Sequence, residues 1–146
     1  MSQTVLITGA SNGIGKACAR VFARKGYDLV LVARHREKLE AVKAELSEYD
    51  VNIKVVAMDL TGEDAAVDLY NNLVLDDISI DILVNNAGFG DHGAFHDSSW
   101  EKQKKMVLLN IMALMQMTYV FGQAMKRRKK GRILNVASIA GLCAGP

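Results

Sequence analysis

Glycines and small polar residues follow the first apolar run of the chain in a spacing that suits phosphate binding. The segment is Thr8-Gly9-Ala10-Ser11-Asn12-Gly13-Ile14-Gly15, and it leads into residues with helical periodicity. Glycines let the backbone turn sharply and approach a pyrophosphate, whose charge faces the free N–H groups of the helix N-terminus. We therefore predict a phosphate-binding turn formed by Gly9, Ser11, Asn12, Gly13, Ile14 and Gly15. A glycine-rich connection without a ligand is the alternative.

The residues around this turn exclude a mononucleotide P-loop. A P-loop ending at Gly15-Lys16 would need glycine at position 10 and Ser or Thr at position 17, where the sequence has Ala10 and Ala17. We therefore do not expect the lysine-assisted phosphate binding of that motif.

Polar residues that could do chemistry also follow the later apolar runs. They are Asp59-Leu60, Asn85-Asn86-Ala87-Gly88 and Asn135-Val136-Ala137-Ser138, together with Asn110 in a long helical segment. Each has a structural alternative. Asp59 could cap the next helix near Gly62, and the asparagine pair could hold a strand-end turn by side-chain to backbone bonds. Asn110 could be a buried helix residue with a satisfied amide, and Ser138 a turn former.

The elements that must position these residues alternate between short apolar runs and segments of helical periodicity. The runs are rich in Val, Ile and Leu on consecutive residues, which is typical of strands buried on both faces of a parallel sheet. Strands are predicted over 4–8, 29–33, 53–58, 80–85 and 132–137, and helices over 14–25, 36–48, 63–76 and 99–130. Ser98 and Glu101 have the capping-box spacing that would start the last helix. The order predicts an α/β fold, a three-layer, doubly wound parallel sheet of about five strands.

Length and composition indicate one domain over residues 1–146, because 146 residues at 50% hydrophobic content suffice for a single core. The 18 basic and 16 acidic residues leave a net charge of +2, which gives no argument for nucleic acid or an acidic partner. Cys18 and Cys143 have no paired spacing and no secretory signal is recognisable. We therefore expect a reducing, cytoplasmic location.

The three glycines, Asp59-Leu60, Asn85-Asn86-Ala87-Gly88, Asn110 and Asn135-Val136-Ala137-Ser138 occur in an order that resembles the short-chain dehydrogenase/reductase family. The resemblance covers essentially the whole chain and implies a Rossmann-type NAD(P)-binding domain. It implies that Gly9, Gly13 and Gly15 shape the pyrophosphate turn and that Asp59 and Leu60 flank the adenine ring. Asn86, Ala87 and Gly88 would line the nucleotide beside them.

The end of the second predicted strand bears on the choice of cofactor. Relatives that use NAD place an acidic residue there to bind the ribose 2′-hydroxyl, whereas this chain has Ala33 followed by Arg34. A guanidinium suits a 2′-phosphate through its charge and bidentate hydrogen bonding, and Ser11 could add a hydroxyl contact. We therefore expect NADP(H) in preference to NAD(H). The alternative is that the basic residues near Arg34 form a solvated helix start.

The resemblance implies a catalytic set of Asn, Ser, Tyr and Lys acting on a carbonyl or secondary alcohol. Ser138 would hydrogen-bond the substrate oxygen, and Asn110 would hold a water or backbone group in a proton relay. The family's Tyr-x-x-x-Lys pair follows the serine, and none of the four tyrosines here has a lysine four residues later. We therefore expect an oxidoreductase domain without its acid-base pair, inactive or nearly so by itself. The alternative is a non-catalytic nucleotide-binding or interaction protein from a shortened gene.

Other ligands and partners have weaker support. Residues 106–125 carry no charge, but four polar residues interrupt them and a predicted strand follows, so we expect no membrane span. The basic run at 126–130 lacks interleaved aromatic residues, which argues against nucleic acid. The three histidines show no metal-ligand spacing. We expect a small-molecule substrate, an exposed edge on the fifth strand, and a homo-oligomer for a full-length form, as the resemblance implies.

Overall fold

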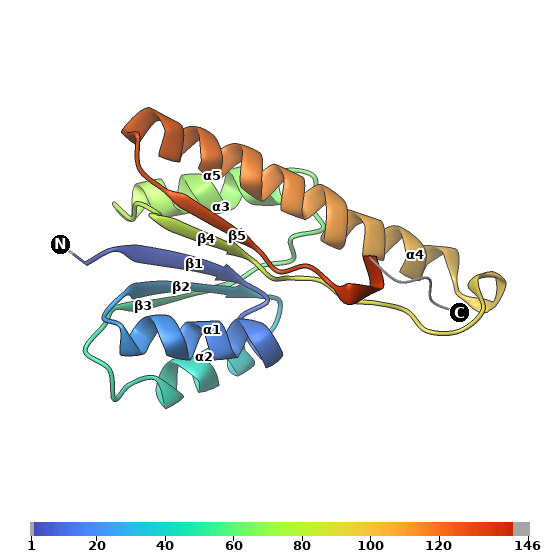
Figure 1. Ribbon diagram of the computed structural model, residues 1–146, viewed down its shortest axis with the longest axis horizontal. Helices are drawn as coiled ribbons and strands as arrows, with labels where there is room; N and C mark the ends of the chain where they lie inside the picture. Colours follow the sequence, from blue (N-terminus) through green and yellow to red (C-terminus); the bar gives the residue numbers. More distant parts are fainter. Residues whose placement is uncertain (1, 142–146) are drawn as a thin grey trace.

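A five-stranded parallel sheet forms the centre of the computed structural model, which describes residues 2–141 (Figure 1). The strand order is β3-β2-β1-β4-β5. The strands are β1 (Thr4–Thr8), β2 (Asp28–Ala33), β3 (Ile53–Ala57), β4 (Ile82–Asn85) and β5 (Arg132–Asn135). The chain moves outward from β1 to β3 and then crosses back to β4 on the other side of β1. The carboxyl ends of β1 and β4 therefore form a topological switch point, the place where open α/β sheets bind ligands.

Helices cover both faces of the sheet, which confirms the predicted three-layer, doubly wound architecture (Figure 1). Helices α1 (Gly13–Arg24) and α2 (Arg36–Glu45) lie on one face. Helix α3 (Ala65–Leu75) and a long helical segment lie on the other. The long segment consists of α4 (Trp100–Val107), a π-helical stretch over Leu108–Ala113, and α5 (Leu114–Arg128). We call the π-helical stretch the π-turn.

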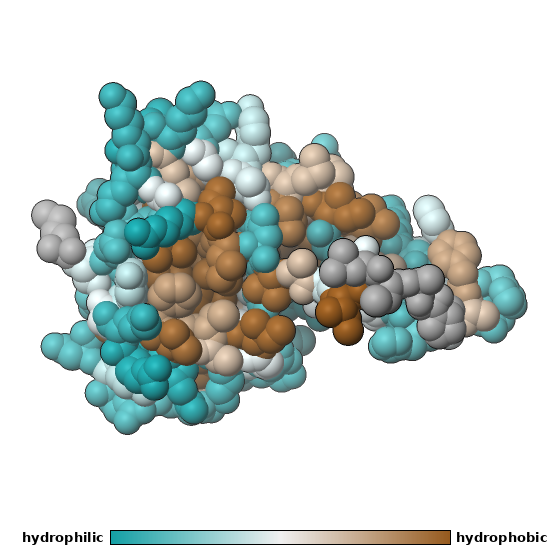
Figure 2. Space-filling model, viewed as in Figure 1, coloured by the Kyte–Doolittle hydropathy of each residue, from teal (hydrophilic) through white to brown (hydrophobic). Residues whose placement is uncertain are grey.

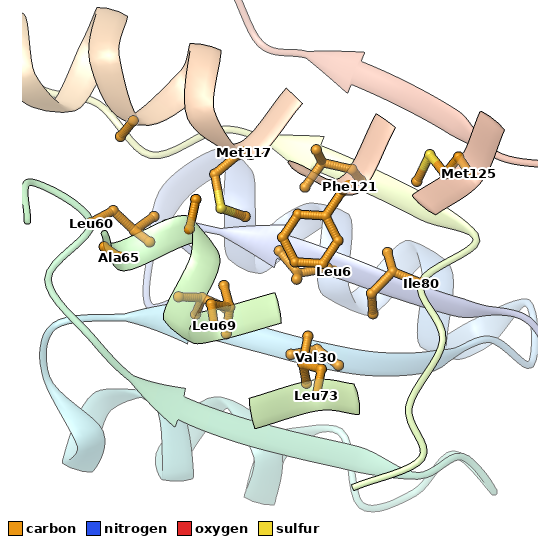
Figure 3. Packing of buried hydrophobic residues seen from close by; sticks show 14 residues of the cluster. Leu6, Val30, Leu60, Ala65, Leu69, Leu73, Ile80, Met117, Phe121 and Met125 are labelled. Atoms are coloured by element: carbon orange, nitrogen blue, oxygen red, sulfur yellow. The ribbon is translucent and has the colours of Figure 1, made fainter. Parts of the chain in front are cut away.

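Alternate residues of β1 pack into two hydrophobic cores, one on each side of the sheet. Leu6 packs with residues of α3 and α5, whereas Val5 and Ile7 pack with residues of α1 and α2. Figure 3 shows the first core, where Phe121 from α5 points toward Leu6. The three β1 side chains are fully buried, because a strand between two neighbours and two helical layers has no solvent-facing side.

Several element boundaries differ from the prediction. Strand β4 begins at Ile82 instead of position 80, β5 ends at Asn135 instead of 137, and α2 ends at Glu45 instead of 48. The start of the long helix also differs. Ser99 is its N-cap and accepts a hydrogen bond from the Lys102 backbone, whereas Ser98 donates its hydroxyl to Asp91. The capping box predicted at Ser98 is therefore wrong, because a tertiary partner engages that serine.

Strand β5 lies at one edge of the sheet, and all four of its residues are exposed. This confirms the exposed edge predicted for the fifth strand. Figure 2 shows apolar surface over β5 and along the neighbouring long helical segment. The segment Trp100–Arg128 is also the one helix in the described part of the chain that is long and apolar enough to cross a membrane. Its Met117 and Phe121 are nevertheless buried against the sheet.

Candidate functional site

Thr8 and Asn86 join the ends of β1 and β4 at the switch point. The buried Thr8 hydroxyl accepts hydrogen bonds from the backbone N–H groups of Asn86 at 2.9 Å and Ala87 at 3.0 Å, and donates to the Val84 carbonyl at 3.3 Å. The Asn86 side chain donates to the carbonyl oxygens of Thr8 at 3.0 Å and Gly9 at 3.3 Å. The strand-end turn proposed as the alternative for this asparagine is therefore present. It leaves the nearby glycine turn in a fixed position.

The glycine turn needs glycine for two different physical reasons. Gly9 and Gly13 have φ of +65° and +50°, the left-handed region that other residues rarely adopt. Gly15 is required by space, because a Cβ there would lie 2.3 Å from the Gly9 carbonyl oxygen and 2.6 Å from the Asn86 side-chain nitrogen. The turn is thus packed against Asn86, and its backbone can approach a ligand closely.

The first turn of α1 offers backbone donors and two unused polar side chains. Asn12 is the N-cap, and its side chain makes no capping hydrogen bond. Ser11 and Asn12 are partly or fully exposed, and Ile14 is 60% exposed at the rim of the turn. An exposed apolar residue beside free helix N–H groups provides both a hydrophobic and an anion-binding surface.

Asp59 and Arg34 belong to the same edge of the sheet, after β3 and β2 respectively. The Asp59 carboxylate accepts hydrogen bonds from the Thr61 backbone N–H at 3.0 Å and hydroxyl at 2.9 Å. These bonds, and more weakly the charges of Arg34 and Lys105, hold the pKa of the Asp59 carboxyl below its ordinary value. The alternative of a helix cap near Gly62 is wrong, because α3 begins at Ala65 with Asp64 as N-cap.

Arg34 and Leu60 present very different surfaces. Arg34 is exposed and forms no ion pair with any residue that the structure describes. Its guanidinium donors are therefore available to a ligand. Leu60 is only 6% exposed and packs in the core, so a nucleotide there would meet mainly its backbone.

Asn110 occupies the π-turn and contacts the segment that follows β4. Its side-chain oxygen accepts from the Phe89 backbone N–H at 3.1 Å, and its side-chain nitrogen donates to the Phe89 carbonyl at 2.8 Å. A Cβ on Gly88 would lie 3.1 Å from the same Asn110 oxygen. The residue is exposed, so the buried-helix alternative for Asn110 is wrong. Single π-turns within α-helices are frequent at functional sites.

Ser138 follows β5 on the carboxyl side of the sheet. Strand β5 is placed by an in-register pair, Asn85 beside Asn135, whose side chains hydrogen-bond at 2.9 Å. Beyond it, the Val136 backbone N–H donates to the Asn85 carbonyl at 2.9 Å. Ser138 is exposed, and its carbonyl accepts from Gly141. The structure thus puts Ser138 at the same sheet edge as Asn86, Ala87 and Gly88.

Two features of this region were not predicted from the sequence. The first is the buried Thr8 hydroxyl, which hydrogen-bonds to three backbone groups at the end of β4. Its sequence signal is a polar residue at the end of an apolar strand. The second is Asp91, whose carboxylate accepts from Ser98, Lys102 and, at 3.1 Å, Gln103. The bonds to Lys102 and Gln103 hold the loop after Gly88 against α4. No sequence motif marks them.

No cluster of potential metal ligands occurs within residues 2–141. Cys143, one of the two cysteines on which the expected reducing location rests, lies outside the described residues. The groups available at this edge are glycine-rich backbone, asparagine amides, hydroxyls, the Asp59 carboxylate and the Arg34 guanidinium, which has no ion-pair partner among the described residues.

Comparisons with known proteins point to one family. A family model described as short chain dehydrogenase matches residues 3–146. The very-long-chain 3-oxoacyl-CoA reductase of Coccidioides immitis (strain RS) is 37% identical over 148 residues, which span 97% of this chain and 42% of that protein. The chain thus spans about half the length of the curated relatives that it matches.

Solved structures give the same result. A short-chain dehydrogenase from Sphingobium yanoikuyae in complex with NADPH superposes with a TM-score of 0.89 at 37% identity, over 97% of this chain and 56% of that one. A metagenomic short-chain oxidoreductase in complex with NADP gives a TM-score of 0.90 at 35% identity, over 97% of this chain and 65% of that one.

Proposed function

Since the chain belongs to the short-chain dehydrogenase family, we propose that it is the nucleotide-binding part of an NADP(H)-dependent oxidoreductase that interconverts a carbonyl and a secondary alcohol. The observation that carries the proposal is the close packing of the glycine turn against Asn86, with an exposed Arg34 after the neighbouring strand β2. A nicotinamide dinucleotide is the cofactor class of the family, and bound here it would supply or take up a hydride.

The described residues fit such a cofactor. Glycine at positions 9 and 15 lets the turn pack directly against Asn86, because a Cβ at either position would collide with that side chain. The N-terminus of α1 favours the pyrophosphate charge, and Asp59 with the Leu60 backbone would flank the adenine ring. Asn86, Ala87 and Gly88 would line the nucleotide along the end of β4.

We assign the preference for NADP(H) to Arg34. Its exposed guanidinium can bind a 2′-phosphate bidentately, and Ser11 lies in the turn that would face the same group. Arg34 and Asp59 form no ion pair in the described structure, so the Arg34 guanidinium keeps its donors for a phosphate. Two solved relatives named for NADP or NADPH complexes support the assignment.

Titration of the chain with NADPH and NADH tests this proposal. Wild type should bind NADPH more tightly, and Arg34→Ala should lose most of that preference while NADH affinity stays nearly constant. Lys38→Ala removes a charge from the same exposed segment and serves as the matched control. Equal affinities for the two nucleotides in wild type would refute the NADP(H) assignment, and no saturable binding of either would refute nucleotide binding.

In the catalytic step, Ser138 would hydrogen-bond the substrate oxygen where charge develops. Asn110 would hold a water or a backbone group, such as that of Phe89, in a proton relay. We propose that the 146 residues alone turn over slowly or not at all, because they contain no Tyr-x-x-x-Lys pair. Their substrate would be a small carbonyl or alcohol compound. We also propose that the full-length protein is cytoplasmic, forms homo-oligomers and is not bound to a membrane.

A further inference from the structure

A cavity of ≈ 230 Å³ lies between the C-terminal ends of α3 and α5. It is lined by residues of both helices and by the segment 77–80, which precedes β4. The candidate nucleotide site follows the carboxyl end of β4. The α3–α5 cavity instead lies toward the amino end of that strand. No residue of the proposed nucleotide or catalytic sets lines it.

The inner walls of the α3–α5 cavity are apolar and rigidly held. Leu73, Ile80 and Phe121 are each no more than 3% exposed, and Figure 3 shows them around the same part of the core. The Phe121 ring meets Tyr70 edge-on, with 5.6 Å between ring centroids. Side chains fixed in this way cannot collapse into the space without losing packing contacts.

The rim of the cavity carries arginine side chains. The Arg128 guanidinium lines the cavity and donates a hydrogen bond to the Ile80 carbonyl. Arg127 donates to the hydroxyl of Tyr70, another lining residue, at 3.3 Å. A guanidinium has five N–H donors, so Arg128 retains donors for a ligand. Asp77 is the one acidic residue among the lining residues and offsets the charge of Arg128, so the excess positive charge at the rim comes from Arg127, which lies outside the lining.

We propose that the α3–α5 cavity binds a small anionic amphiphile, with an apolar body against Phe121 and Leu73 and a carboxylate hydrogen-bonded to Arg128. An apolar cavity of about 150 Å³ accommodates benzene. The larger space here suits an acyl chain of about eight carbons, or one aromatic ring that carries the acid. Arginine matches a carboxylate geometrically, which selects the anion over an alcohol or amine of equal length.

Isothermal titration of the 146-residue chain with octanoate, octanol and octylamine tests the proposal. Octanoate should bind most tightly and octylamine most weakly. Arg128→Gln should weaken octanoate binding about tenfold, the loss typical of a hydrogen bond to a charged group, and should abolish the preference over octanol. Lys126→Gln removes a charge from the same helix end outside the cavity lining, and it should leave the affinity unchanged.

A cavity-filling variant separates binding in the cavity from binding elsewhere. Ala124 lines the cavity and is 5% exposed, so Ala124→Phe should abolish binding of all three compounds. If circular dichroism shows that this variant does not fold, the comparison of Arg128→Gln with Lys126→Gln still tests whether the ligand binds in the cavity. Equal binding of octanoate and octylamine, equal losses in the two charge variants, or no saturable heat with wild type would overturn the proposal.

Vesicles of phosphatidylglycerol distinguish a free acid from a lipid headgroup as the source of the anion. Co-sedimentation that octanoate competes away, and that Arg128→Gln loses, assigns the headgroup to the same cavity. Absence of co-sedimentation with retained octanoate binding assigns the free acid. A third outcome is that octanoate does not bind, and that neither octanoate nor Arg128→Gln changes co-sedimentation. That outcome would show that the basic surface and not the cavity attracts anions.

Discussion

Thr8 and Asn86 bond to each other reciprocally: the Thr8 hydroxyl accepts from the Asn86 backbone at 2.9 Å, and the Asn86 side chain donates to the Thr8 carbonyl at 3.0 Å. The pair links the carboxyl ends of β1 and β4 at the switch point. It also couples the glycine turn to Ala87 and Gly88, because Asn86 reaches the Gly9 carbonyl as well. The two halves of the proposed nucleotide site therefore share one hydrogen-bond network.

Thr8→Val should lower the free energy of unfolding by about 2 kcal/mol, because it deprives two backbone N–H groups of their acceptor. The N–H groups are those of Asn86 and Ala87. Thr8→Ser keeps the hydroxyl and should stay close to wild type. Urea unfolding of the three proteins measures the difference, and a Thr8→Val variant as stable as wild type would show that the hydroxyl does not stabilise this turn.

Gly15→Ala should lower the free energy of unfolding by about 1–3 kcal/mol, the cost of overpacking a close contact. The added carbon would lie 2.3 Å from the Gly9 carbonyl oxygen, so the turn must shift and NADPH affinity should fall with stability. A Cβ on Gly90 meets open space, which makes Gly90→Ala the matched control. Unchanged NADPH affinity in Gly15→Ala would separate the turn from the nucleotide site.

Asp91 should make stability depend on pH in the acid range. Hydrogen bonds from Lys102 and Ser98 lower the pKa of its carboxyl to about 2 in the folded chain, against about 3.9 in an unfolded one. A depressed pKa contributes stability above the unfolded value and loses it as pH falls through the folded value. The contribution is therefore complete above about pH 4 and gone below about pH 2.

Asp91→Asn should accordingly be less stable than wild type at pH 6, and the gap should narrow as the pH approaches 2. Asp97→Asn changes an exposed acid in the same loop and should show no comparable convergence. Urea midpoints across this range measure the effect. A gap that is constant with pH would mean that the loop does not depend on the charge of Asp91.

Asn110→Asp should lower the free energy of unfolding by about 1 kcal/mol at neutral pH, the net value of one lost hydrogen bond. An ionised carboxylate still accepts from the Phe89 N–H but cannot donate to the Phe89 carbonyl. Gln123→Glu adds the same charge to the exposed side of α5 and controls for it. Nuclear magnetic resonance of Phe89 and Gly88 should show shifts in the Asn110 variant that the control lacks.

Most of the fold could be predicted from local sequence, because consecutive Val, Ile and Leu residues mark strands that are buried on both faces. All five strands overlap their predicted ranges. Boundaries were harder to predict, since Ile80 is a buried core residue that precedes β4 and its apolar character looks the same as that of the strand. The serine cap was misplaced by one residue for a related reason, because only the folded chain brings Asp91 to Ser98.

The candidate site could be predicted in part. The glycine turn and the polar residues after β3, β4 and β5 do lie at one edge of the sheet. The contacts among them could not be predicted, because Thr8 with Asn86 and Phe89 with Asn110 join residues that are distant in sequence. The π-turn that carries Asn110 likewise has no local signature in its apolar residues.

Strand β1 pairs with β2 on one side and β4 on the other, and its three central residues are fully buried. Amide hydrogen exchange should therefore be slowest in β1 and should quicken outward to β3 and β5, which have one neighbour each within the described sheet. The glycine turn is the direct continuation of that slowest strand. Transient opening of either sheet edge would therefore leave the turn attached to the part of the molecule that opens last.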